Sequence, residues 1–89
     1  MKQKTALITG ASKGIGFAVA KRFAPELSDL HLAARGAEGL QEAAEALAQP
    51  GLNVHLHPVD LTKEEGVHSL AQGVLSATPK LDVLVNNAG

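Results

Sequence analysis

Apolar residues along the chain fall into two alternating patterns. Short, nearly continuous apolar runs occupy residues 4–9, 30–34 and 81–85, and a further strand is expected at 53–59, where Val54 and Leu56 alternate with His55 and His57. The segments between them, 14–24, 36–49 and 62–77, repeat apolar residues every three or four positions. The runs are typical of strands buried on both faces, and the longer spacing is typical of helices packed along one side. The pattern therefore predicts an α/β chain of four strands and three helices.

The regular alternation of strand and helix also constrains the topology. Strands joined by helices are parallel, with right-handed crossovers. Pro58 lies inside the third strand and cannot donate to a ladder, which places that strand at an edge. We predict the strand order 3-2-1-4. The order reverses between strands one and four, so a ligand crevice is expected at their carboxyl ends.

Two helices carry finer local signals. In the first, Ile15, Val19 and Phe23 recur at four-residue steps and are predicted to face the sheet. In the third, Thr62 and Glu65 have the spacing of a capping box, with Thr62 as the N-cap. Proline-containing breakers are expected to end the helices, at Pro25, Pro50-Gly51 and Thr78-Pro79.

A glycine-rich turn joins the first strand to the first helix. Residues 9–16 read Thr-Gly-Ala-Ser-Lys-Gly-Ile-Gly. Gly10 suits a tight turn, Gly14 allows the backbone to approach a ligand, and Gly16 allows the helix to lie close to the sheet. A helix amino terminus in this position is suited to binding a phosphate, although an ordinary strand-to-helix loop has similar composition.

This turn resembles the cofactor-binding motif of the short-chain dehydrogenase/reductase family. It matches neither the general Gly-x-Gly-x-x-Gly fingerprint nor the P-loop. Val59-Asp60-Leu61-Thr62 is similar to the family's segment after strand three, and Asn86-Asn87-Ala88-Gly89 to its Asn-Asn-Ala-Gly motif. The resemblance covers essentially the whole chain and implies a Rossmann-type parallel sheet flanked by helices, an incomplete doubly wound fold with residues 1–89 as its dinucleotide-binding part.

The resemblance also implies a set of cofactor-binding residues. They are Gly10, Ser12, Lys13, Gly14, Ile15, Gly16, Arg35, Asp60, Leu61, Asn87, Ala88 and Gly89. In the family, the Asp side chain and the next backbone N–H meet the adenine ring. The Asn-Asn-Ala-Gly motif steadies the sheet and lines the cofactor's ribose. Asp60 could instead serve only as a turn or helix-start carboxylate beside Thr62.

The end of the second strand bears on which dinucleotide is bound. An acid there suits the ribose hydroxyls of NAD, whereas an arginine suits the 2′-phosphate of NADP. This chain has Arg35 and no acid at that point, and Lys13 lies in the glycine-rich turn. The pair favours NADP(H) over NAD(H), and the family's NADP-dependent members look similar at both places. The alternative is that both side chains are solvated loop cations.

No catalytic residue is assigned. The family's hydride-transfer chemistry depends on a Tyr-x-x-x-Lys pair and a Ser, together with an Asn after strand four, and this sequence has no tyrosine. The chain by itself is predicted to be inactive. One hypothesis makes it the cofactor-binding portion of an NADP(H)-dependent carbonyl reductase or alcohol dehydrogenase, whose parent enzyme the family suggests is a homo-oligomer. The other makes it a stand-alone nucleotide-binding module or half of a split enzyme.

Composition removes several other functions. The net charge of −1 gives no electrostatic case for nucleic acid or a membrane surface, and no apolar run approaches a membrane span. The absence of cysteine excludes disulfides and thiolate metal sites, and we expect a cytoplasmic protein. His31, His55 and His57 could in principle form a small metal site, but a structural role is favoured and no metal is predicted.

Overall fold

The fold was analysed in a computed structural model that describes residues 4–10, 14–77 and 80–86. Its strands are β1 (Thr5–Thr9), β2 (Asp29–Ala34), β3 (Asn53–Pro58) and β4 (Val83–Val85). Its helices are α1 (Gly14–Phe23), α2 (Ala37–Leu47) and α3 (Glu64–Ala77), with a short 3₁₀ turn at Ala24–Glu26. The predicted alternation of strands and helices is confirmed. No helix in these ranges is both long enough and apolar enough to cross a lipid bilayer.

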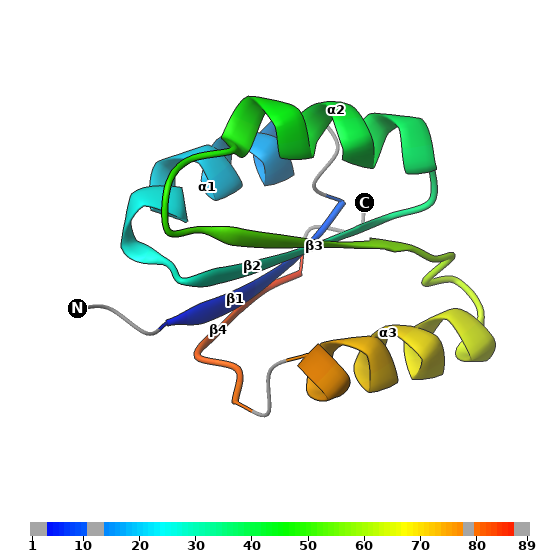
Figure 1. Ribbon diagram of the computed structural model, residues 1–89. Helices are drawn as coiled ribbons and strands as arrows, with labels where there is room; N and C mark the ends of the chain where they lie inside the picture. Colours follow the sequence, from blue (N-terminus) through cyan, green and yellow to red (C-terminus); the bar gives the residue numbers. More distant parts are fainter. Residues whose placement is uncertain (1–3, 11–13, 78–79, 87–89) are drawn as a thin grey trace.

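The four strands form one parallel sheet in the order β3-β2-β1-β4. Helices α1 and α2 cover one face and α3 covers the other, as Figure 1 shows. The predicted order is therefore confirmed, and so is the edge position of the strand that contains Pro58. Because all strands run the same way, their carboxyl ends lie along a single edge of the sheet.

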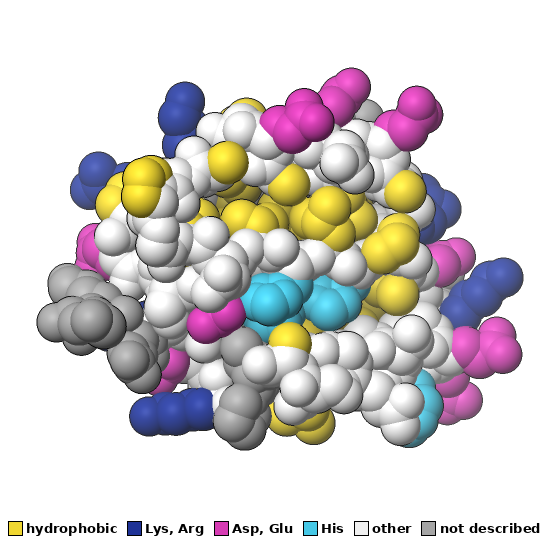
Figure 2. Space-filling view, in the orientation of Figure 1, with side chains coloured by type: hydrophobic (Ala, Val, Ile, Leu, Met, Phe, Trp, Pro, Cys, Tyr) yellow, Lys and Arg dark blue, Asp and Glu magenta, His cyan; other side chains and the backbone are white. Residues whose placement is uncertain are grey.

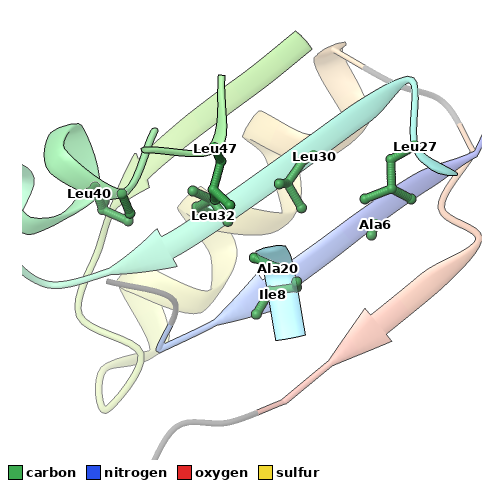
Figure 3. Close-up of a cluster of buried hydrophobic side chains, with 9 residues drawn as sticks. Ala6, Ile8, Ala20, Leu27, Leu30, Leu32, Leu40 and Leu47 are labelled. Atoms are coloured by element: carbon green, nitrogen blue, oxygen red, sulfur yellow. The ribbon is translucent and has the colours of Figure 1, made fainter. Parts of the chain in front are cut away.

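Alternate residues of the two central strands supply the two faces of the core. On one face, side chains of β1 and β2 meet those of α1 and α2 in the larger apolar cluster, which Figure 3 shows. Leu30 and Leu32 of β2 are fully buried there, beside Ile8 of β1. On the opposite face, Leu7 and Ala33 pack beneath α3. The near-continuous apolar runs of β1 and β2 follow directly from this burial on both sides.

The prediction that residues 81–85 form a buried strand is wrong. Val83 is 40% exposed and Leu84 is 61% exposed in β4, because β4 pairs with β1 alone in the described sheet.

The predicted apolar stripe of α1 is wrong. Ile15 is 72% exposed and Phe23 is 45% exposed, while the buried positions of the helix are Gly16 and Ala20. Only Val19 of the predicted stripe packs against the core, as a half-buried side chain. Small residues occupy the line of closest approach because they allow the helix backbone to come near the sheet, and bulky side chains are displaced to its flanks.

The predicted capping box of α3 is also wrong. The helix begins at Glu64, and its first backbone bond runs from the N–H of Val67 to the carbonyl of Lys63, 3.2 Å away. The hydroxyl of Thr62 instead donates to Oδ1 of Asp60 at 2.6 Å. Because the helix begins at Glu64, Lys63 and not Thr62 occupies the N-cap position, and Thr62 belongs to the turn formed with Asp60.

Candidate nucleotide-binding site

The described candidate residues gather along the carboxyl edge of the sheet (Figure 1). Gly10 and Gly14 follow β1, Arg35 follows β2, and Asp60 and Leu61 come shortly after β3. The remaining described candidates, Ile15 and Gly16, belong to the first turn of α1. Five predicted positions fall outside the described residues: Ser12, Lys13, Asn87, Ala88 and Gly89.

The glycine-rich turn requires glycine conformations at both of its ends. Gly10 has φ 64° and Gly14 has φ 67°, in the left-handed region that other residues adopt at a cost. A Cβ placed on Gly14 would meet no atom within 4 Å, so this position faces open space where a ligand can approach. Gly16 is one of the buried residues of α1, as expected of a position that lets the helix lie close to the sheet.

The amino terminus of α1 gives the turn a positive electrostatic potential. The first turn of a helix has N–H groups without intrahelical partners, and the helix dipole is positive there. No acidic residue lies in the first turn of α1 to offset that charge. The geometry is therefore suited to a phosphate group held by backbone N–H groups beside Gly14.

The turn at Gly10 also permits a direct prediction. Gly10→Ala should lower the free energy of unfolding by about 1–2 kcal/mol, because alanine is strained at positive φ. Urea denaturation of the purified protein measures this loss. Gly36→Ala is the matched control, since Gly36 has φ −92° and an added Cβ there meets no atom within 4 Å. Equal losses in the two variants would contradict the conformational explanation.

Thr9 and Asn86 join the ends of the two strands that flank the crevice. Thr9 is buried, and its Oγ1 lies 3.2 Å from Oδ1 of Asn86 and 3.4 Å from the carbonyl oxygen of Val85. The contact ties the end of β1 to the end of β4, next to the start of the segment 87–89. Sequence reasoning assigned no role to Thr9. Its signal was a lone polar side chain at the end of an otherwise apolar strand.

Asp60 is fixed by its own turn. Its Oδ1 accepts hydrogen bonds from the backbone N–H of Thr62 at 3.0 Å and from the Thr62 hydroxyl at 2.6 Å. These bonds hold the pKa of the Asp60 carboxyl below its usual value, with smaller contributions from the positive charges of Arg35 and Lys63. The carboxylate is therefore charged at neutral pH. Asp60 is therefore a turn carboxylate beside Thr62, as the alternative interpretation held. Both hydrogen bonds from Thr62 end on its Oδ1.

Arg35 lies exposed immediately after β2. Its positive charge makes a minor contribution to the lowered pKa of Asp60. The adjacent Val59 N–H donates to the carbonyl of Ala34 at 3.0 Å, which fixes the backbones of the two segments together. Arg35 and Asp60 thus follow neighbouring strands at the carboxyl edge of the sheet.

The three neighbouring histidines are not arranged around a common point. His31 and His57 are in hydrogen-bond contact and all three rings are stacked. Within residues 4–10, 14–77 and 80–86, no group of three or more His, Asp or Glu side chains is placed to hold a metal ion.

Comparison with known proteins places these features in context. The family model described as short chain dehydrogenase matches residues 4–89. Fatty acyl-CoA reductase of Acinetobacter baylyi is 42% identical over 89 residues, which cover 100% of this chain and 30% of that protein. Carbonyl reductase [NADPH] 1 of Mus musculus is 42% identical over 85 residues, covering 94% of this chain and 31% of that protein.

A solved structure matches over the whole chain. L-Sorbose reductase from Gluconobacter frateurii, complexed with NADPH and L-sorbose, superposes with a TM-score of 0.92 and 42% identity. The match covers 100% of this chain and 34% of that one. The chain thus spans about a third of the length of the relatives that it matches.

Proposed function

The chain belongs to the short-chain dehydrogenase/reductase family, and from this premise we propose that residues 1–89 form the NADP(H)-binding part of an oxidoreductase. The reaction class is hydride transfer between a nicotinamide cofactor and a carbonyl or alcohol. The observation that carries the proposal is the open amino terminus of α1, entered through two positive-φ glycines at the carboxyl end of β1.

The pyrophosphate of the cofactor is assigned to this turn. Backbone N–H groups at the start of α1 would donate to its oxygens, and the absence of a side chain at Gly14 would allow close approach. Ser12, Lys13 and Ile15 belong to the same turn and would complete it. Gly16 acts indirectly, because it lets the helix lie against the sheet.

The preference for NADP(H) rests on Arg35. It is exposed at the end of β2, where a guanidinium can form charge-assisted hydrogen bonds with a 2′-phosphate. No Asp or Glu occupies residues 33–37, so β2 itself ends without the acid that would accept from ribose hydroxyls. L-Sorbose reductase in complex with NADPH and carbonyl reductase [NADPH] 1, both similar to this chain, support the same assignment.

The adenine is assigned to the turn after β3. The Asp60 carboxylate is charged and uses Oδ1 for Thr62, so Oδ2 would accept from the adenine amino group. The backbone N–H of Leu61 would donate to the ring. Asn87, Ala88 and Gly89 would line the ribose beyond β4, where the contact between Thr9 and Asn86 fixes the start of that segment.

These residues bind and orient; they do not transfer protons. A nicotinamide held here would supply the hydride chemistry, and the 89 residues contain no tyrosine to act as the family's general acid or base. The catalytic groups of the proposed oxidoreductase would therefore come from elsewhere in the protein.

Isothermal titration calorimetry tests the proposal. The purified protein is titrated with NADPH, NADH, 2′,5′-ADP and 5′-AMP at fixed ionic strength. We expect NADPH to bind about 10–100-fold more tightly than NADH, which corresponds to the ~1.5–3 kcal/mol of one charge-assisted contact. The same order is expected for 2′,5′-ADP over 5′-AMP. Equal affinities would contradict the NADP(H) preference, and no binding of any of the four would contradict the nucleotide site.

A further inference from the structure

The face of the sheet beneath α3 contains a stack of three histidine rings. His31 on β2 is fully buried, whereas His55 and His57 on β3 are half-buried. The centroid of the His31 ring lies 4.4 Å from that of His55 and 5.1 Å from that of His57, with interplanar angles of 16° and 25°. Figure 2 shows histidine side chains on the surface between the helical layers above and below the sheet.

His31 and His57 share one proton in a hydrogen bond, and His55 is in contact with Asp29. Nδ1 of His31 lies 2.8 Å from Nε2 of His57, so one of these nitrogens carries a proton and the other accepts it. Nε2 of His55 lies 2.9 Å from Oδ1 of Asp29. If both His31 and His57 were fully protonated, two N–H groups would point at each other and the 2.8 Å contact could not form.

Helix α3 packs against this face of the sheet, close to His57. A Cβ placed on Gly73 of α3 would lie 3.1 Å from two atoms of the His57 ring. Leu70 and Val74 of the same helix are buried against Leu7 and Ala33. The backbone of α3 at Gly73 therefore lies close to the His57 imidazole, and a side chain larger than glycine there would press on that ring.

Few charges face the stack to stabilise an added proton. Asp29 is the facing carboxylate, and its hydrogen bond with His55 holds its pKa below the usual value. β1 contributes Leu7 to this side of the sheet, in register with His31. α3 contributes apolar residues and Gly73, while its own titratable side chains, Glu64, Glu65 and His68, are exposed.

The burial of these rings lowers their affinity for protons. Burial, followed by the charges of His55 and His57, lowers the pKa of His31 to about 4. Burial, followed by the charge of His55, lowers the pKa of His57 as well. An unfolded histidine has a pKa of about 6.5, so from about pH 6.5 down to about 4 the opened state binds more protons than the closed state. The closed state is therefore favoured above this window and loses stability as the pH falls through it.

We propose that His31, His55 and His57 form an acid-sensitive clasp that holds α3 and β3 against β2 at neutral pH and releases them in mild acid. The stacked rings and the contact between His31 and His57 form the closed clasp. Release would begin at β3, because it is an edge strand paired on one side within the described sheet. The clasp stands on the packing of these elements alone, whether or not the chain binds a dinucleotide.

Hydrogen exchange of the whole natural protein, measured by mass spectrometry, tests the clasp. Protection is compared at pH 7.5 and pH 5.0 after correction for the intrinsic exchange rate. We expect peptides from α3 and β3 to lose at least about 10-fold in protection at pH 5.0, as one extra proton per opening event implies, while peptides from α1 and β1 change less. Unchanged protection of α3 and β3 would overturn the proposal.

Two variants separate the clasp from a general effect of acid. His31→Gln retains a hydrogen-bonding group toward His57 but does not titrate, so the acid-induced loss should be clearly smaller than in the wild type, with the remainder due to His57. His68→Gln removes an exposed histidine from α3 and should leave the wild-type loss intact. If His31→Gln does not fold, His57→Gln carries the same expectation. A variant that folds and retains the full wild-type loss would overturn the proposal.

Discussion

Arg35→Glu is expected to lower the affinity for NADPH by about 100-fold. The substitution removes a charge-assisted contact of ~1.5–3 kcal/mol with the 2′-phosphate and introduces repulsion between two anions. NADH lacks that phosphate, and a glutamate at the end of β2 can accept hydrogen bonds from ribose hydroxyls. The affinity for NADH should therefore stay constant or rise. Parallel titrations of both cofactors at one ionic strength give the ratio.

Arg22→Glu is the matched control for this charge reversal. Arg22 is exposed in the last turn of α1, at the end of the helix away from the glycine-rich turn. Arg22→Glu makes the same change in net charge without touching the proposed site. The affinities for NADPH and NADH should therefore each change by less than about threefold, through long-range electrostatics alone. A parallel fall in NADPH and NADH affinity in Arg35→Glu would contradict a contact with the 2′-phosphate.

Leu32→Ala is expected to lower the free energy of unfolding by about 3 kcal/mol. Leu32 is fully buried on the central strand β2, among side chains of β1, α1 and α2 (Figure 3). Truncation removes apolar contacts and leaves a cavity between strand and helix, for which buried leucines lose about 2–5 kcal/mol. Urea denaturation, monitored by circular dichroism, measures the loss. Such a loss is a large part of the stability of a typical domain.

Leu75→Ala provides the comparison at an exposed site. Leu75 lies on α3 and is 62% exposed, so its truncation should change the free energy of unfolding by less than about 0.5 kcal/mol. Alanine also has the higher helix propensity, which offsets part of any lost contact. Similar losses at Leu32 and Leu75 would mean that the face of the sheet beneath α1 and α2 is not the main source of stability.

Local sequence signals were sufficient wherever one chemical feature decided the outcome. Pro58 placed β3 at an edge because proline has no N–H for a ladder. Gly10 was expected in a tight turn and Gly14 at a close backbone approach, and both have the positive φ that glycine tolerates best. Pro25 was expected to end the first helix, and α1 ends at Phe23 with Pro25 in the 3₁₀ turn that follows.

Local sequence signals gave wrong predictions where two packing or hydrogen-bonding arrangements were both plausible. The four-residue spacing of Ile15, Val19 and Phe23 is a helical pattern, but spacing cannot tell which side of a helix meets the sheet when small residues form another side. Thr62 could have stood at the N-cap of α3 or in a turn with Asp60, and the helix begins one residue too late for Thr62 to be its N-cap. In both cases, the deciding contact depends on distances in three dimensions.

The sequence by itself determined the parallel α/β topology, the edge strand and the glycine-rich entry to α1, because backbone conformation and burial on both faces restrict residue types position by position. Only the tertiary structure decided which side of α1 is buried, how Thr9 meets Asn86, and how His31 stacks between His55 and His57. These contacts join segments 24 to 77 residues apart, or depend on how closely two elements approach. Sequence spacing contains no information about such distances, and packing sets them.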